Sequence, residues 1–157
     1  MRNFSRDLEK VTKKHNSMGI KNLFFILLLF CATFVMSVAQ AQVYKLRTTS
    51  VAFKSKVNNY KWSNWSSWED TSVLVVMDVE KDRITVYSKE TQIYDIAENE
   101  GNEEDEDGDE TWSYYCVNED GLNCRVRFVK LNSQDGRLQL YIDFDDMSWV
   151  YNLYSLD

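Results

Sequence analysis

Strict alternation of apolar and polar side chains over residues 137–145 is the feature that most limits what this chain can fold into. Four apolar side chains of this run lie on one side of an extended strand: Leu138, Leu140, Ile142 and Phe144. A period of two residues is typical of a β-strand that places one face in a core. No window of the chain shows a convincing helical period, so the sequence predicts an all-β domain.

Other runs of this kind repeat along the chain. Asp120-Gly121 and Asp135-Gly136 each lie between two consecutive runs, and an Asp-Gly pair in that position is a strong hairpin signal. The runs predict about eight strands: Val43–Lys54, Thr71–Val79, Arg83–Ser88, Thr91–Ala97, Trp112–Val117, Asn123–Leu131, Arg137–Asp145 and Trp149–Tyr154. Sequential hairpins favour an antiparallel meander. We expect it to close into a small lipocalin-like barrel, because closure removes exposed strand edges. A two-sheet sandwich is the alternative, since strand spacing does not separate the two folds.

The 16 apolar residues Leu23–Val38 follow Lys21 and lead into the small-residue site Ala39-Gln40-Ala41. This order is that of a bacterial secretory signal peptide. The run is short for a membrane span of about 20 residues, so an uncleaved anchor is the lesser alternative. We expect cleavage after Ala41, with cleavage after Ala39 as the close alternative, and a periplasmic or secreted product without stable membrane insertion.

The domain organisation follows from this signal. Residues 1–41 form an N-terminal extension and signal peptide, and residues 42–157 form one mature β domain. Residues 1–17 are polar and unlike the rest, and Met18 resembles a more natural start. The alternative is that these residues form a long functional n-region.

Six of the 18 basic residues and two of the 25 acidic residues precede residue 42. The mature part therefore holds 12 basic and 23 acidic residues, a net charge of −11. Such a domain repels phosphate backbones, so we do not expect nucleic-acid binding.

The single histidine, His15, also lies before residue 42, which removes the usual general base and the commonest metal ligand. We expect no cofactor and no enzymatic activity. The alternative is a carboxylate-only, glycosidase-like hydrolase that uses acids among Glu69, Asp70, Asp143, Asp145 and Asp146.

Residues 98–110 carry nine acidic side chains and no apolar one, which predicts an acidic, mobile loop. Asp105, Asp107 and Asp109 alternate around Gly108 and resemble part of an EF-hand calcium loop. The twelfth position is Tyr114, where an EF-hand needs glutamate. A calcium-stabilised surface protein is therefore one hypothesis, and a solvated hairpin loop is the other.

Cys116 and Cys124 flank Glu119-Asp120-Gly121 symmetrically. A three-residue loop with Gly121 in the left-handed conformation places them directly opposite each other. In an exported protein we expect them to form a disulfide, which stabilises without redox activity. The alternative is a pair of buried reduced thiols.

The sequence Trp62-Ser63-Asn64-Trp65-Ser66 matches the WSxWS pattern of class I cytokine receptors, and with Trp68 it also resembles the tryptophan ladder of thrombospondin type 1 repeats. The match covers only this segment, so neither function is carried over. A polyproline-like conformation would place Trp62, Trp65 and Trp68 on one face, open to stacking by Arg or Lys. The alternative is that two of them cap the core and the third lies at a rim.

As a whole, the chain resembles the small exported β-proteins of Gram-negative bacteria, a general pattern that implies no particular activity. We expect a non-enzymatic binding or interaction module for a small ligand, a glycan or a protein. Its site is then the barrel interior or the segment that holds Trp62, Trp65 and Trp68.

Overall fold

The computed structural model describes residues 42–58 and 61–156. The predicted extension, signal peptide and cleavage sites at residues 1–41 lie outside the described residues. Within the described part of the chain, no helix is long and apolar enough to cross a membrane.

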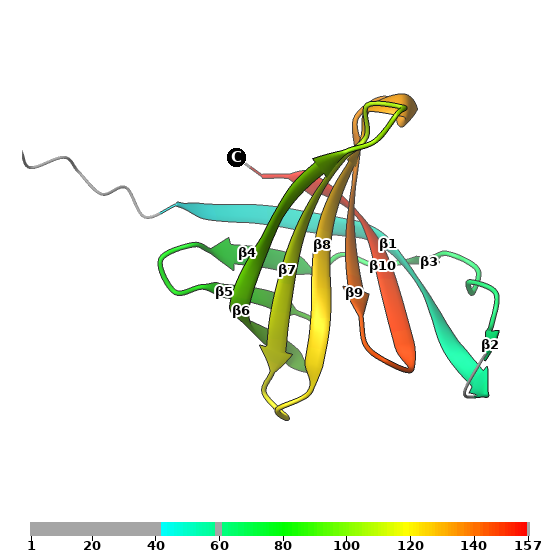
Figure 1. Cartoon of the computed structure of the whole chain (residues 1–157), viewed down its shortest axis with the longest axis horizontal. Coiled ribbons are helices and arrows are strands. Elements are labelled where there is room, and N and C mark those ends of the chain that lie inside the picture. Colours follow the sequence, from blue (N-terminus) through cyan, green and yellow to red (C-terminus); the bar gives the residue numbers. More distant parts are fainter. Residues whose placement is uncertain (1–41, 59–60, 157) are drawn as a thin grey trace, which may run out of the picture. The chain divides into compact units, whose positions relative to one another are not determined.

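The described residues form an antiparallel β-barrel of eight strands with two short additional strands (Figure 1). The strands are β1 (Val43–Asn58), β2 (Lys61–Trp62), β3 (Glu69–Asp70), β4 (Leu74–Asp78), β5 (Arg83–Tyr87), β6 (Thr91–Glu104), β7 (Glu110–Asn118), β8 (Asn123–Leu131), β9 (Arg137–Asp143) and β10 (Met147–Ser155). A single 3₁₀ turn, η1 (Asn132–Gln134), joins β8 to β9. From β4 to β10, each strand pairs with the next along the chain. The predicted meander and barrel are confirmed, and the sandwich alternative was wrong.

The barrel closes because β1 pairs with both β4 and β10. Its first part, Val43–Arg47, lies against β4, with Val43 opposite Asp78 and Arg47 opposite Leu74. The pairing with β10 runs from Leu46 to Ser55 and contains one irregularity, between Thr48 and Ser50. Beyond Arg47, the edge of β1 that faced β4 is therefore available to another segment.

The inward side chains form one apolar cluster that fills the barrel. Residues that lie opposite each other on neighbouring strands share a face of the sheet. The register therefore directs apolar side chains of successive strands into one interior, as with Val75 opposite Val86 and Val126 opposite Ile142. Its fully or almost fully buried members are Val75, Ile84, Val86, Tyr94, Cys116, Cys124, Val126, Leu140, Ile142, Tyr151 and Leu153. Burial of one such aliphatic side chain stabilises a fold by about 1.5–3 kcal/mol. This packed interior does not support the expectation of a ligand site inside the barrel.

The predicted acidic loop at residues 98–110 was wrong in extent. Strand β6 continues to Glu104 and β7 begins at Glu110, so the turn contains only residues 105–109. The strand pairing is interrupted by two bulges, between Ile96 and Glu98 and between Asn99 and Gly101. Backbone hydrogen bonds to β7, rather than apolar burial, hold this exposed stretch in strand form.

The expected disulfide was also wrong, although its geometry was partly right. Cys116 lies directly opposite Cys124, and Gly121 has a φ of 77°, as the three-residue turn requires. Both thiols are nevertheless free and buried. The backbone N–H of Asn118 donates to Leu122 O (2.9 Å), which makes that pair, and by alternation the cysteine pair, a hydrogen-bonded position. Side chains stand farther apart there than at non-hydrogen-bonded positions, beyond the usual Cβ separation of a disulfide.

Candidate functional site

Residues 61–73, here called the Trp segment, cover the edge of β1 that β4 leaves open. Val73 N–H donates to Thr48 Oγ1, and Thr48 N–H donates to Val73 O, at 2.9 and 3.0 Å. At the other end, β2 pairs with β1 between Lys56 and Trp62. Between them, β3 pairs with Ser50 and Val51. The segment thus occupies a strand edge that would otherwise be exposed.

Two serines attach the middle of the Trp segment to β1 by the same pair of bonds. Ser63 donates its N–H to Ser55 O (2.8 Å), and its hydroxyl accepts the N–H of Ser55 (3.1 Å). Ser66 makes the same two bonds to Phe53, again at 2.8 and 3.1 Å. The two serines are three residues apart in the Trp segment, whereas their partners, Ser55 and Phe53, are two residues apart on β1. This repeat fixes the spacing of the tryptophans that precede each serine.

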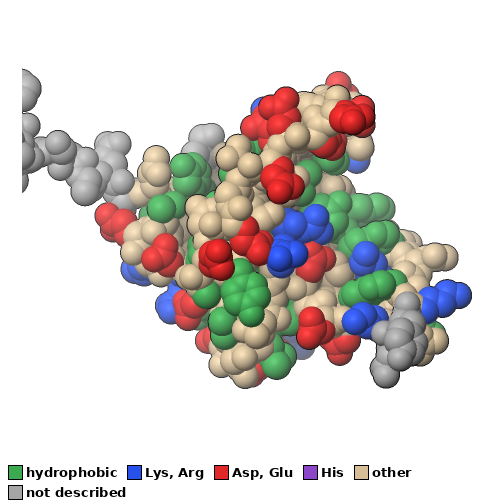
Figure 2. Space-filling view, viewed as in Figure 1, with side chains coloured by type: hydrophobic (Ala, Val, Ile, Leu, Met, Phe, Trp, Pro, Cys, Tyr) green, Lys and Arg blue, Asp and Glu red, His purple; other side chains and the backbone are tan. Residues whose placement is uncertain are grey.

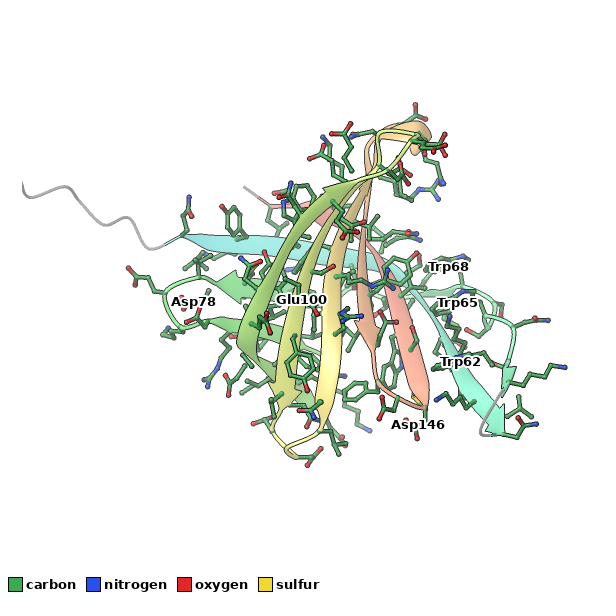
Figure 3. The ribbon with its side chains drawn as sticks, viewed as in Figure 1. Trp62, Trp65, Trp68, Asp78, Glu100 and Asp146 are labelled. Atoms are coloured by element: carbon green, nitrogen blue, oxygen red, sulfur yellow. The ribbon has the colours of Figure 1, made fainter. Side chains whose placement is uncertain are left out.

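Trp62, Trp65 and Trp68 lie one after another along the segment (Figure 3), and the first two form a ladder with lysines of β1. Lys54 Nζ lies 5.1 Å from the ring centre of Trp62 and 4.7 Å from that of Trp65, and Lys56 Nζ lies 5.5 Å from Trp62. Trp68 is 48% exposed. The predicted stacking by basic residues is confirmed for Trp62 and Trp65. None of the three belongs to the core cluster, so the core-capping alternative was wrong.

The ladder continues across the outside of the barrel onto β9 and β8. Trp65 packs edge-on against Tyr141, with ring centres 6.3 Å apart. The guanidinium of Arg127 lies 4.7 Å from the Tyr141 ring centre and also bonds to Asp143. A continuous row of cations and rings therefore connects the Trp segment to strand β8.

An open groove of about 940 Å³ lies beside this row, on the outer face of the barrel. Its floor comes from outward side chains of β7 and β8, and Lys54, Trp62 and the β9–β10 turn form its sides. The lining residues used below are Glu100, Tyr115, Arg125, Arg127, Asp143 and Ser148. On the face shown in Figure 2, basic and acidic side chains lie next to each other in the middle, whereas acids predominate at the end of the β6–β7 hairpin.

Four of the seven charged residues that line the groove form two ion pairs. Arg125 makes two parallel hydrogen bonds to Glu100, both 2.7 Å long. Arg127 Nε donates to Asp143 (2.9 Å), whose other oxygen accepts the hydroxyl of Ser148 (2.5 Å). The hydrogen bonds from Arg125 hold the pKa of Glu100 below its usual value. The groove therefore offers fixed donors and acceptors with nearly balanced charge.

This arrangement gives the hydrolase alternative little support. Asp143 and Asp145 line the groove, whereas Glu69 and Asp70 lie on β3 and pair with β1. Asp146 lies in the β9–β10 turn (Figure 3), and its carbonyl accepts the N–H of Lys56.

The calcium hypothesis finds no coordination shell in the structure. Asp105 Oδ1 accepts the N–H groups of Asp107 and Asp109, both at 3.0 Å, and so caps its own turn. Asp109 is bound by the N–H and hydroxyl of Ser133, at 2.8 and 2.9 Å. Among residues 42–58 and 61–156, no three Asp, Glu, Cys or His side chains are grouped as metal ligands. These carboxylates act within the hairpin, so the structure lends no support to a calcium site at the three aspartates, and that site stays a prediction.

Sequence reasoning missed most of the groove residues. Arg125 and Arg127 alternate with the inward Cys124 and Val126, so their outward direction was readable from the sequence. Their partners Glu100 and Asp143 depend on the strand register, and the acidic composition around Glu100 predicts a loop rather than a strand. Of the predicted binding residues, only Trp62 reaches the groove; Trp65 lies beside it in the ladder.

The fold and the groove define the class of this domain as a small antiparallel barrel with a packed interior and an external polar groove. No protein-family model, curated protein or solved structure matches the chain.

Proposed function

We propose that this protein is an exported, non-enzymatic binding module whose ligand lies in the external groove. The observation that carries the proposal is the position of two Arg–carboxylate pairs in an open groove of about 940 Å³. Surface ion pairs contribute little to stability, typically below about 1 kcal/mol. Two such pairs that converge on one hollow are therefore better explained by recognition than by folding.

The chemistry of the groove suits a neutral, hydroxyl-rich ligand such as a glycan. Arg125 and Arg127 are already neutralised by Glu100 and Asp143, so an anionic ligand would have to displace a carboxylate. The paired groups retain hydrogen-bonding capacity for hydroxyls, since a guanidinium has five donors and a carboxylate has about four acceptor sites. Tyr115 adds an aromatic side chain for the apolar faces of a sugar.

The proposal is tested by titrating the full-length protein with maltohexaose, cellohexaose and chitohexaose, and with polygalacturonate as the anionic comparison. We expect at least one neutral oligosaccharide to shift amide signals of β7 and β8 in two-dimensional NMR spectra. Arg125→Ala should then weaken binding by about tenfold, because it removes charge-assisted bonds and frees Glu100.

Arg83→Ala is the matched control, because Arg83 forms a similar exposed pair with Asp95 (2.7 Å) outside the groove. It should leave the affinity unchanged. The proposal fails if none of the neutral oligosaccharides binds, if polygalacturonate binds better, or if the two arginine variants behave alike.

A further inference from the structure

A second hollow lies at the end of the barrel where β5 turns into β6, β7 into β8 and β9 into β10. It encloses about 350 Å³, within the range of small-ligand sites. We call it the end hollow and define it by three rings, Tyr94, Phe144 and Trp149, and three acids, Glu90, Glu119 and Asp120.

The rings form an inclined aromatic group. The ring centres of Phe144 and Tyr94 are 6.5 Å apart, and their planes are inclined at 55°. The ring centres of Phe144 and Trp149 are 5.9 Å apart, and their planes are inclined at 85°. The Tyr94 hydroxyl donates to Gln92 Oε1 (2.7 Å), so its polar atom is already satisfied. Tyr94 is only 3% exposed, so the half-buried Phe144 and Trp149 supply most of the accessible aromatic surface. A ring face favours an alkylated cation over an uncharged group of the same shape.

The acids of the rim are held by a well-bonded turn. The side-chain oxygen of Asn118 accepts the N–H groups of Asp120 (3.1 Å) and Leu122 (2.8 Å). Gly121 N–H donates to Asn118 O (3.0 Å). The backbone that carries Glu119 and Asp120 is thereby fixed, and both residues line the hollow together with the aromatic group.

The end hollow differs in charge from the external groove. None of the ten described residues that line it is basic, whereas Lys54, Arg125 and Arg127 line the groove. Lys89 precedes Glu90 in the chain but is not among the lining residues. No described basic residue lines the end hollow, although Arg83 lies within electrostatic range of Glu119.

We propose that the end hollow binds a small organic ammonium ion, with its alkylated nitrogen against the rings and its charge balanced by the rim carboxylates. This site is separate from the proposed glycan groove.

The test uses choline and its uncharged isostere 3,3-dimethylbutan-1-ol, titrated into the full-length protein. We expect choline to shift the indole N–H signal of Trp149 and to bind about tenfold more tightly than the isostere. The double variant Glu90→Gln/Glu119→Gln should weaken choline binding by about fivefold. Both residues are exposed, so the fold should tolerate the change.

Glu80→Gln/Glu106→Gln is the matched control, since it removes the same charge from exposed positions in the β4–β5 and β6–β7 turns, which do not line the end hollow. It should bind choline like the unaltered protein. The proposal is overturned if the isostere binds equally well, if calcium chloride alone shifts the Trp149 signal to the same extent, or if both double variants weaken binding equally. Oligosaccharide binding is followed by the amide signals of β7 and β8 and by its loss in Arg125→Ala. The glycan proposal can therefore fail or succeed independently of the choline result.

Discussion

The ammonium group of Lys54 lies between two tryptophan rings, 5.1 Å from the centre of Trp62 and 4.7 Å from that of Trp65. The contact joins β1 to the Trp segment across a covered strand edge. It therefore links the stability of the barrel wall to the segment that forms one side of the groove.

Lys54→Met should destabilise the protein by about 1–2 kcal/mol, because it removes a cation from two rings while it keeps the apolar stem. Urea unfolding followed by tryptophan fluorescence measures the effect. Lys61→Met, an exposed lysine of the same segment, is the control and should change stability by less than about 0.5 kcal/mol. Equal unfolding midpoints for the two variants would contradict the role of the ladder.

The serine bonds give a second test. Ser63→Ala and Ser66→Ala each remove the acceptor of a β1 backbone N–H, and each should cost about 0.5–1.5 kcal/mol. Amide hydrogen exchange at Ser55 and Phe53 should rise in the matching variant. Ser67→Ala changes an exposed neighbour and serves as the control. Unchanged exchange at both amides would show that the hydroxyls do not hold the segment.

The two cysteines should be inert in the native protein. Burial raises the pKa of Cys116 to about 12 and that of Cys124 to about 11. The reactive thiolate is therefore scarce at pH 8, and modification by Ellman's reagent should be about a hundredfold slower than in urea, where two thiols per mature domain react. Rapid labelling without denaturant, or spontaneous oxidation to a disulfide during aerobic storage, would contradict this expectation.

Calcium should leave the thermal stability unchanged at millimolar concentration, because Asp105 and Asp109 are already bound within the hairpin. Asp105→Ala should instead lower the stability by about 0.5–1.5 kcal/mol, since two turn N–H groups lose their acceptor. Asp107→Ala, at an exposed position of the same turn, is the control. A calcium-dependent rise in melting temperature that Asp105→Ala abolishes would restore the calcium hypothesis.

The ion pair between Arg125 and Glu100 predicts a particular acid response. Because the folded-state pKa of Glu100 is lowered from 4.5, its contribution is fully present above pH 4.5 and is lost as the pH falls through the folded-state value. Glu100→Gln should thus be less stable than the unaltered protein near neutral pH and approach it below pH 4. Melting temperatures across this range test the prediction, with Glu98→Gln, exposed on the same strand, as the control.

Most strands were predictable because alternation reports which face is buried. Strand β8 matches its predicted bounds, Asn123–Leu131, since Cys124, Val126 and the arginines between them alternate without interruption. The second half of β6 was not predictable in this way. It has no apolar side chain at Glu98–Glu104, and its strand form depends on backbone bonds to a partner strand, which composition does not reveal.

The candidate site was less predictable than the fold, because it depends on neighbours across strands. The WSxWS spacing indicated that Trp62 and Trp65 could meet basic side chains, and they do. It did not indicate which lysine they meet or that Tyr141 and Arg127 extend the row. Those contacts follow from the register of β1, β8, β9 and β10, which no local pattern specifies.

The pairing of β1 with β10 also has a consequence for biosynthesis. Their contacts include a hydrogen bond between Thr49 and Asn152, which are 103 residues apart in the chain. A nascent chain that has not yet produced β10 holds β1 with a vacant row of backbone donors and acceptors, which a chaperone or a neighbouring polypeptide can occupy. Because long-range pairing slows folding, β1 is open to such contacts until β10 has been made.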